Sequence, residues 1–190
     1  MTNIKLSILI PTVPSRLESF FPKIIRTFEK QVGDRKDVEI LGFYDNKKRS
    51  VGSKRQTLLD MANGEYLVFI DDDDDISEKY IDIVMETLYN NPETDCVVYD
   101  CICTVNNANP LHCKYGIEYE YHQDGSNWWG KPAHTMIYRS KIAKSHRFDN
   151  KNFGEDVDWV KRACKDIKIQ TRIDEILYYY KFNESTTETR

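Results

Sequence analysis

The 190-residue sequence predicts an α/β domain in which a mostly parallel β-sheet is flanked by helices. Two observations predict this class. Short apolar runs alternate with amphipathic stretches along the first half of the chain, and the runs end at prolines or acidic residues. The length suits one compact domain. We expect a single domain over residues 1–190, with a regular half over about 1–104 and a smaller, mixed half over about 105–190.

The expected strands of the regular half are short apolar runs. Runs of this kind fit strands that are buried on both faces of a parallel sheet. The first run, KLSILI, stops at Pro11, and the third, EYLVFI, leads directly into acidic residues. The four strands are expected at 5–10, 38–44, 65–70 and 96–104.

The segments between these strands carry helix signals. Ser15 and Glu18 have the spacing of a capping box, which predicts that a helix begins at Ser15. Pro22 should bend or restart this helix, because proline disrupts a helix interior. The three expected helices are 15–31, 50–63 and one that Ser77 caps.

The chain after residue 104 gives weaker signals. Residues 106–132 are rich in Asn, Gly, Tyr and Trp without clear periodicity, so no regular element is expected there. Further along the chain, the expected elements are a strand at 134–139, a short helix after Ser140, a helix at 155–165, and strands at 167–173 and 176–182.

Composition and charge narrow the classes of protein to which the chain can belong. The formal net charge is −4, so the chain has no overall basic field of the kind that holds nucleic-acid phosphates. No apolar stretch approaches the roughly 18–20 residues that cross a bilayer. The five cysteines are odd in number and irregularly spaced, which argues against a disulfide framework and favours the reducing cytoplasm.

Polar residues follow three of the expected strands. Thr12 and Asp45 come after the first two, and Asp71–Asp75 follow the third. Because the carboxyl ends of parallel strands meet at one edge of a sheet, we expect these side chains to converge. Neighbouring carboxylates repel one another unless a cation neutralises them, and carboxylate oxygens suit Mg²⁺ or Mn²⁺. The alternative is a solvated acidic loop, whereas an EF-hand would need a glycine and a glutamate that are missing here.

The start of the second expected helix has two interpretations. Gly52, Lys54 and Arg55 lie in its first turns. A helix N-terminus preceded by a glycine and accompanied by basic residues can receive phosphate. Alternatively, the segment is a capped surface helix with solvated cations.

The second half of the chain offers further candidates with alternative interpretations. Glu155 and Asp156 open a helix, where a carboxylate can act as a general base or can simply complement the helix dipole. His134 is either a site residue or a histidine with an ordinary structural partner. Trp129 could stack on a sugar or could pack in the core.

Three blocks of the sequence, in this order, resemble glycosyltransferase family 2 enzymes of the GT-A fold. LSILIPTVPSR resembles the opening strand and base-binding loop of that family. VGSKRQTLLDMANGEYLVFIDDDDDIS resembles the segment that ends in its Asp-x-Asp motif, and NFGEDVDW resembles its Glu-Asp motif. The resemblance covers roughly residues 4–182. It implies a Rossmann-like sheet with a nucleotide-sugar-binding half over about 1–104 and an acceptor-side half over about 105–190.

The resemblance also implies a reaction. A sugar would move from a nucleoside-diphosphate sugar, expected to be UDP-linked, to a hydroxyl of a glycan, glycoconjugate or other acceptor, with inversion and with Mn²⁺ or Mg²⁺ as cofactor. The residues expected to bind the donor are Pro11, Thr12, Val13, Arg16, Asp45, Gly52, Lys54, Arg55, Asp71 and Asp72.

The remaining residues receive roles from the same resemblance. Asp73, with Asp71, is expected to hold the metal. Asp156 is expected to be the catalytic base, next to Glu155, with a pKa that neighbouring carboxylates raise. The residues expected on the acceptor or metal side are His134, Trp129 and Asn183, the last standing where many relatives carry a histidine.

Other functions stay open at the level of sequence. A nucleotidyltransferase shares this sheet and an aspartate-bound metal, but it should carry a glycine-rich loop after the first strand, and PTVPSR has no glycine. A non-catalytic nucleotide- or glycan-binding domain is the second alternative, although the intact Glu155-Asp156 pair argues against it. Sugar transfer to DNA bases draws no support from the net charge.

Overall fold

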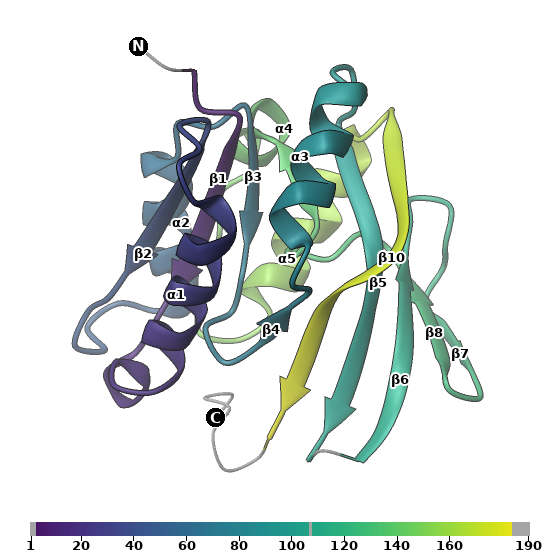
Figure 1. Ribbon diagram of the computed structural model, residues 1–190. Helices are drawn as coiled ribbons and strands as arrows, with labels where there is room; N and C mark the ends of the chain where they lie inside the picture. Colours follow the sequence, from purple (N-terminus) through teal and green to yellow (C-terminus); the bar gives the residue numbers. More distant parts are fainter. Residues whose placement is uncertain (1–2, 107, 184–190) are drawn as a thin grey trace.

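The computed structural model describes residues 3–106 and 108–183. One mixed β-sheet forms the centre of the molecule, and its central strands are mostly parallel. Helices α1 (Phe20–Val32) and α3 (Tyr80–Asn90) cover one face (Figure 1). On the other face lie α2 (Val51–Met61), α4 (Ser140–Ser145) and α5 (Glu155–Ala163). The predicted α/β class with helices on both faces is confirmed.

The strands of the described residues form one sheet. They are β1 (Leu6–Pro11), β2 (Val38–Phe43), β3 (Tyr66–Phe69), β4 (Asp75–Ile76), β5 (Cys96–Val105), β6 (Ala108–Tyr115), β7 (His122–Asp124), β8 (Asn127–Gly130), β9 (Ile137–Arg139) and β10 (Gln170–Phe182). Their order is β2-β1-β3-β9-β5-β6-β8-β7, with β10 paired to β5 and β4. β1 is parallel to β2 and β3, and β10 is parallel to β5.

Strand β9 is antiparallel and lies between β3 and β5, an insertion that the sequence does not reveal. It is shorter than the expected strand at 134–139, because the residues before Ile137 form a turn. Arg139 anchors its end by donating to the Thr94 carbonyl at 3.0 Å and to the Tyr66 hydroxyl at 2.7 Å. His134 therefore lies in a loop at the edge of the sheet rather than within a strand.

The carboxyl ends of β1, β2 and β3 meet at one edge of the sheet. The Thr12 amide donates to the Phe43 carbonyl at 2.9 Å, and the Ile70 amide donates to the Leu9 carbonyl at 3.0 Å. All residues of β1 and β3 are buried, as their apolar sequences predict. Burying a Leu, Ile or Val side chain stabilises a fold by about 1.5–3 kcal/mol. These strands are therefore stable, and they fix the positions at which the following loops begin.

An aromatic cluster fixes helix α5 against the sheet. The rings of Phe148 and Trp159 stack with centroids 4.9 Å apart, and Phe69 of β3 packs edge-on against both. The Trp159 indole nitrogen also donates to the His146 carbonyl at 3.0 Å. Because Trp159 is fully buried, the first turn of α5 is held at a fixed position relative to β3.

Two capping predictions are wrong. Ser15 lies in a 3₁₀ turn (Pro14–Arg16), and α1 begins only at Phe20, because the chain here turns toward the acidic run. Ser77 is not the N-cap of α3, which begins at Tyr80. Its amide donates to the Leu177 carbonyl at 3.0 Å, so Ser77 continues the extended chain of β4 instead.

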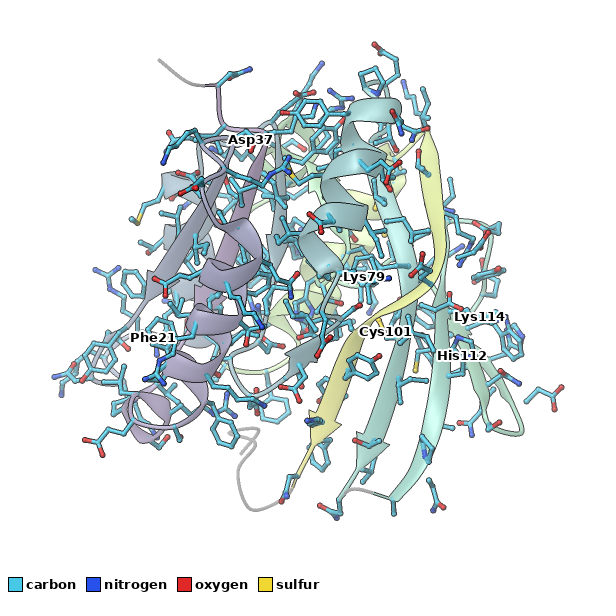
Figure 2. The ribbon with its side chains drawn as sticks, viewed as in Figure 1. Phe21, Asp37, Lys79, Cys101, His112 and Lys114 are labelled. Carbon is cyan, nitrogen blue, oxygen red and sulfur yellow. The ribbon has the colours of Figure 1, made fainter. Side chains whose placement is uncertain are left out.

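The irregular segment 106–132 contains strands β6, β7 and β8, where no regular element was expected. β7 is exposed along its whole length, so it lacks the apolar alternation that signals a strand. These strands lie far from α1, as His112 of β6 and Phe21 of α1 show in Figure 2. The two strands expected within 167–182 are one strand, β10, whose register against β5 shifts between Ile173 and Tyr178.

No helix within residues 3–106 and 108–183 is long and apolar enough to span a membrane.

Gly52 allows the first turn of α2 to contact the loop before α5. A Cβ atom at Gly52 would lie 1.9 Å from the Asp149 carbonyl oxygen, a distance that the backbone cannot accommodate without moving. Gly52→Ala should therefore lower the free energy of unfolding by about 1–3 kcal/mol. Urea unfolding of the purified domain measures this change.

The matched control is Gly116→Ala, because the three atoms nearest to a Cβ there all belong to the end of the Glu118 side chain, which can rotate away. Equal stability of the two variants would contradict the close contact at Gly52.

Candidate active site

A cavity of about 440 Å³ opens at the edge of the sheet where β1, β2 and β3 end. Its walls are the loops after these strands, the start of α2, the start of α5 and the loop before β9. Twelve of the residues singled out in the sequence line it: Pro11, Thr12, Val13, Arg16, Lys54, Arg55, Asp71, Asp72, Asp73, His134, Glu155 and Asp156.

Four other residues singled out in the sequence are not part of the cavity wall. Asp45 pairs with the cavity residue Lys54, Oδ1 to Nζ, at 2.8 Å. Gly52 is buried beneath the Asp149 backbone. Trp129 lies on β8 and stacks on His122 with centroids 4.5 Å apart. Asn183 directly follows β10.

The start of α2 is closed to phosphate in this structure. The amides of Val51, Gly52 and Ser53 already donate to the Asn152 side chain, the Lys151 carbonyl and the Ser50 hydroxyl, at 3.0, 3.0 and 3.1 Å. A phosphate at this helix N-terminus would have to displace these partners. The side chains of Lys54 and Arg55, rather than the helix amides, face the cavity.

The five aspartates of the acidic run have two different roles: some line the cavity, and the others form contacts that stabilise the fold. Asp74 accepts from the Tyr178 hydroxyl at 2.5 Å and from the Lys181 amide at 2.8 Å, so it joins β10 to the site. Asp75 belongs to β4 and pairs with Lys23 at 2.6 Å. The first three aspartates, in contrast, line the cavity.

Arg16 holds the middle of the acidic run. Its two terminal nitrogens donate to Asp72 Oδ1 and Asp73 Oδ2, each at 2.6 Å, and the Thr12 hydroxyl donates to Asp72 Oδ2 at 2.5 Å. The loop after β1 and the loop after β3 are therefore linked through charge. The carboxylate of Asp72 is buried by these partners.

Asp71 and Asp73, the carboxylates expected to hold a divalent cation, both line the cavity, but cationic side chains already contact them. Asp71 Oδ1 accepts from Arg55 at 2.8 Å, Asp71 Oδ2 faces His134 at 3.2 Å, and Asp73 Oδ2 accepts from Arg16 at 2.6 Å. Burial, with a contribution from Asp71 and Asp72, outweighs Arg16 and raises the pKa of Asp73 to about 6. A cation at Asp73 would favour the ionised form. Among the described residues there is no group of three or more His, Cys, Asp or Glu side chains that could hold a metal by itself. Mg²⁺ or Mn²⁺ held by this pair would need further oxygen ligands from substrate phosphates and water.

His134 joins Asp71 to Asp156. Its Nε2 lies 3.2 Å from Asp71 Oδ2, and its Nδ1 lies 3.1 Å from Asp156 Oδ2. Burial and Arg55 oppose the charge on the ring, but the two carboxylates outweigh them and raise the pKa of His134 to about 9. The imidazole is therefore a cation between two carboxylates at neutral pH.

The expectation that neighbouring carboxylates raise the pKa of Asp156 is wrong. Burial does act in that direction, but His134 and then Arg55 outweigh it and hold the pKa of Asp156 well below its ordinary value. Asp156 is therefore ionised throughout the neutral range. The sequence places Asp156 near other acidic residues but does not reveal the two cations that face it.

Arg55 forms a second bridge across the site. Its Nη2 donates to Asp71 at 2.8 Å, and its Nε donates to Glu155 at 3.2 Å. Both Arg55 and Glu155 are buried, with 4% of each residue exposed. The Arg55 Nη1 atom is buried and has no hydrogen-bond partner among the described residues, although Arg55 lines the cavity. The guanidinium charge next to the cavity would favour an anionic ligand, although the Nη1 atom itself is not exposed to the cavity.

Six residues of the cavity wall were not assigned to the site from the sequence. They are Val51, Asn152, Phe153 and Tyr180, together with Lys47 and Arg49, which stand out in the sequence only as a local basic patch that could serve a small anion. Asn152 and Phe153 immediately precede the Glu155 helix, so their position was a usable signal. Tyr180 lies on β10, far from the other blocks in the sequence, and no local pattern marks it.

A family model described as glycosyl transferase family 2 matches residues 18–147, which is most of the chain. The chain belongs to glycosyl transferase family 2. None of the curated proteins matches its sequence.

Solved structures resemble this family 2 domain in fold. A fragment of S. aureus TarS in complex with UDP-GlcNAc superposes with a TM-score of 0.68 at 16% identity, covering 97% of this chain and 61% of the fragment. Another crystal structure of S. aureus TarS gives a TM-score of 0.68 at 16% identity, covering 94% of this chain. The chain spans only 37% of that TarS chain. At this identity the likeness shows the fold alone.

Arg55→Met tests the charge balance of the family 2 domain. The substitution removes the guanidinium and leaves Asp71 and Glu155 without this buried partner. Breaking a buried ion pair on one side costs about 3–5 kcal/mol, so the free energy of unfolding should fall by that amount. Urea unfolding at neutral pH measures the loss, and the exposed Arg49→Met, in the same cavity wall, should change it by less than about 0.5 kcal/mol.

The loss of stability in Arg55→Met should depend on pH. Burial raises the pKa of Asp71, but Arg55 and His134 outweigh it and hold this pKa below its ordinary value. The stabilisation is therefore present above the unfolded pKa, about 3.9, and is lost as the pH falls. The stability difference between wild type and Arg55→Met should shrink on acidification, and a difference that grows in acid would contradict the assignment.

Proposed function

We propose that this domain transfers a sugar from a UDP-sugar to an acceptor hydroxyl, with inversion at the anomeric carbon and with Mg²⁺ or Mn²⁺. One observation carries the proposal. Asp71, Asp73 and Asp156 lie in the same cavity wall, together with the cationic side chain of Arg55. A site for a divalent cation, a fixed positive charge and an ionised base are the parts that such a transfer needs.

The donor side is proposed to use the loops after β1, β2 and β3. Pro11, Thr12 and Val13 form the wall next to Arg16 and would accommodate the base and ribose. Lys54 would act at the diphosphate side, although its Nζ presently contacts the Thr12 carbonyl at 3.0 Å and Asp45 at 2.8 Å. The crystal structures of S. aureus TarS with UDP-GlcNAc and with UDP support a uridine nucleotide.

Asp71 and Asp73 would hold the divalent cation, which when bound offsets negative charge that develops on the leaving diphosphate. Arg55 would add a fixed positive charge on the same side, because it is buried and cannot move into solvent. These contacts would make departure of the nucleoside diphosphate easier without any covalent intermediate on the protein.

Asp156 is proposed to take the proton from the acceptor hydroxyl. Its carboxylate is 28% exposed and lines the cavity, so an acceptor can reach it. His134 and Arg55 lower the pKa of Asp156, which keeps it in the form that accepts a proton but makes it a weaker base than an ordinary aspartate. A single base opposite the leaving group suits direct displacement, which inverts the anomeric carbon. Glu155 would act indirectly, because its carboxylate is buried against Arg55.

The cysteines support a reducing compartment such as the cytoplasm. All five are free thiols, and three of them, Cys96, Cys101 and Cys113, are buried in the sheet.

Asp73→Asn and Asp156→Asn should separate the two halves of the reaction. Both should reduce kcat for sugar transfer or for UDP-sugar hydrolysis by about 10²–10⁴-fold. Only Asp73→Asn should weaken UDP binding in the presence of Mn²⁺, by about 10- to 100-fold, because Asp156 does not serve the donor. Release of UDP measures the first effect, and titration calorimetry with UDP and Mn²⁺ measures the second.

Asp75→Asn is the matched control within the same acidic run, since Asp75 pairs with Lys23 outside the cavity. It should keep both activity and UDP binding. Equal loss of UDP binding in Asp73→Asn and Asp156→Asn would contradict the assigned roles.

A further inference from the structure

The loop before β9 brings His134 between two carboxylates that come from distant parts of the chain. Asp71 follows β3, and Asp156 lies in the first turn of α5. The imidazole lies between them, with 3.2 Å from Nε2 to Asp71 and 3.1 Å from Nδ1 to Asp156. Only 13% of the His134 side chain is exposed, so water does not replace either contact easily.

The loop that carries His134 is itself anchored. The Tyr138 hydroxyl donates to the carbonyls of Pro132 and Ala133, each at 3.1 Å. The buried Tyr99 hydroxyl donates to the Thr135 carbonyl on the other side of the histidine. Backbone carbonyls on both sides of His134 are therefore bound to buried tyrosines. The imidazole occupies a fixed position before any substrate binds.

Asp156 has one contact for each of its oxygens. The Val157 amide donates to Oδ1 at 2.8 Å, and His134 lies against Oδ2. Without the imidazole, the Asp156 carboxylate would keep, among the described residues, the contact to its neighbouring amide alone. The carboxylate could then rotate about its side-chain bonds away from the cavity.

We propose that His134 is a positioning residue that aims the Asp156 carboxylate at the acceptor through Nδ1 and holds Asp71 on the donor side through Nε2. This inference rests on the proposed function, because it assigns His134 a role in sugar transfer. It goes beyond that function by linking the two halves of the site through one side chain. The two ring nitrogens serve different halves, so their contributions should separate.

Two isosteric substitutions separate the contacts. The amide nitrogen of asparagine lies where histidine has Nδ1, so His134→Asn keeps a donor toward Asp156 and loses the one toward Asp71. The amide nitrogen of glutamine lies where histidine has Nε2, so His134→Gln does the reverse. His134→Ala removes both donors.

The test compares kcat for UDP-sugar turnover with the affinity for UDP in the presence of Mn²⁺. His134→Gln and His134→Ala should lose about 100-fold in kcat, the cost of a misplaced catalytic group, whereas His134→Asn should stay within about tenfold of wild type. For UDP affinity the order reverses. His134→Gln should bind as wild type does, whereas His134→Asn and His134→Ala should bind about tenfold more weakly.

The matched control is His146→Ala. His146 makes a similar contact to an aspartate, 2.7 Å from Nε2 to Asp166, but it does not line the cavity. This variant should keep both kcat and UDP affinity. Circular dichroism and thermal unfolding check that each variant is folded.

Parallel loss of kcat and UDP affinity in His134→Asn and His134→Gln would overturn the inference, because a merely structural histidine would produce that pattern. Wild-type kcat in all three variants would overturn it as well, while leaving the proposed function intact. A wild-type domain that binds UDP with Mn²⁺ but turns over no UDP-sugar would overturn the proposed function, and this inference with it.

Discussion

Two cations compensate three carboxylates at the carboxyl end of β3. His134 lies between Asp71 and Asp156, and Arg55 lies between Asp71 and Glu155. Glu155 is buried and the other two carboxylates are partly buried, so without these cations the meeting of the loop before β9, helix α2 and helix α5 would be destabilised. The charge balance of the site and the packing of the fold therefore depend on the same contacts.

The ion pairs within the site also affect how a nucleotide-sugar donor would bind. Asp73 pairs with Arg16, and Lys54 pairs with Asp45, so part of the charge that would meet a nucleotide is already engaged within the protein. A diphosphate with its cation would exchange these internal pairs for new ones. Such exchange costs less than building a charged site from solvent, because the groups are already desolvated. Arg55 differs, since one of its terminal nitrogens has no partner among the described residues.

The sequence allowed prediction of the α/β class and of the edge of the sheet at which the polar side chains meet. That inference succeeded because buried parallel strands have a strong local signature and a simple geometric consequence. The exposed strand β7 and the insertion of β9 could not be predicted from the sequence, since each depends on pairing between distant segments. The same limit applies to the contacts of His134, which the sequence offered as a candidate without revealing its partners. Its sequence neighbourhood shows only a histidine after Pro132, whereas its two partners lie in distant segments.

The proposed function requires that the cavity binds a uridine nucleotide together with a divalent cation. Thermal unfolding of the wild-type domain with UDP, ADP and GDP, each with Mn²⁺ or with EDTA, measures this binding, because a ligand of the folded state raises the melting temperature. We expect a clear increase for UDP with Mn²⁺, a smaller one for the purine nucleotides, and little change for UDP in EDTA. An equal response to UDP with and without the cation, or none at all, would rule out cation-dependent uridine nucleotide binding.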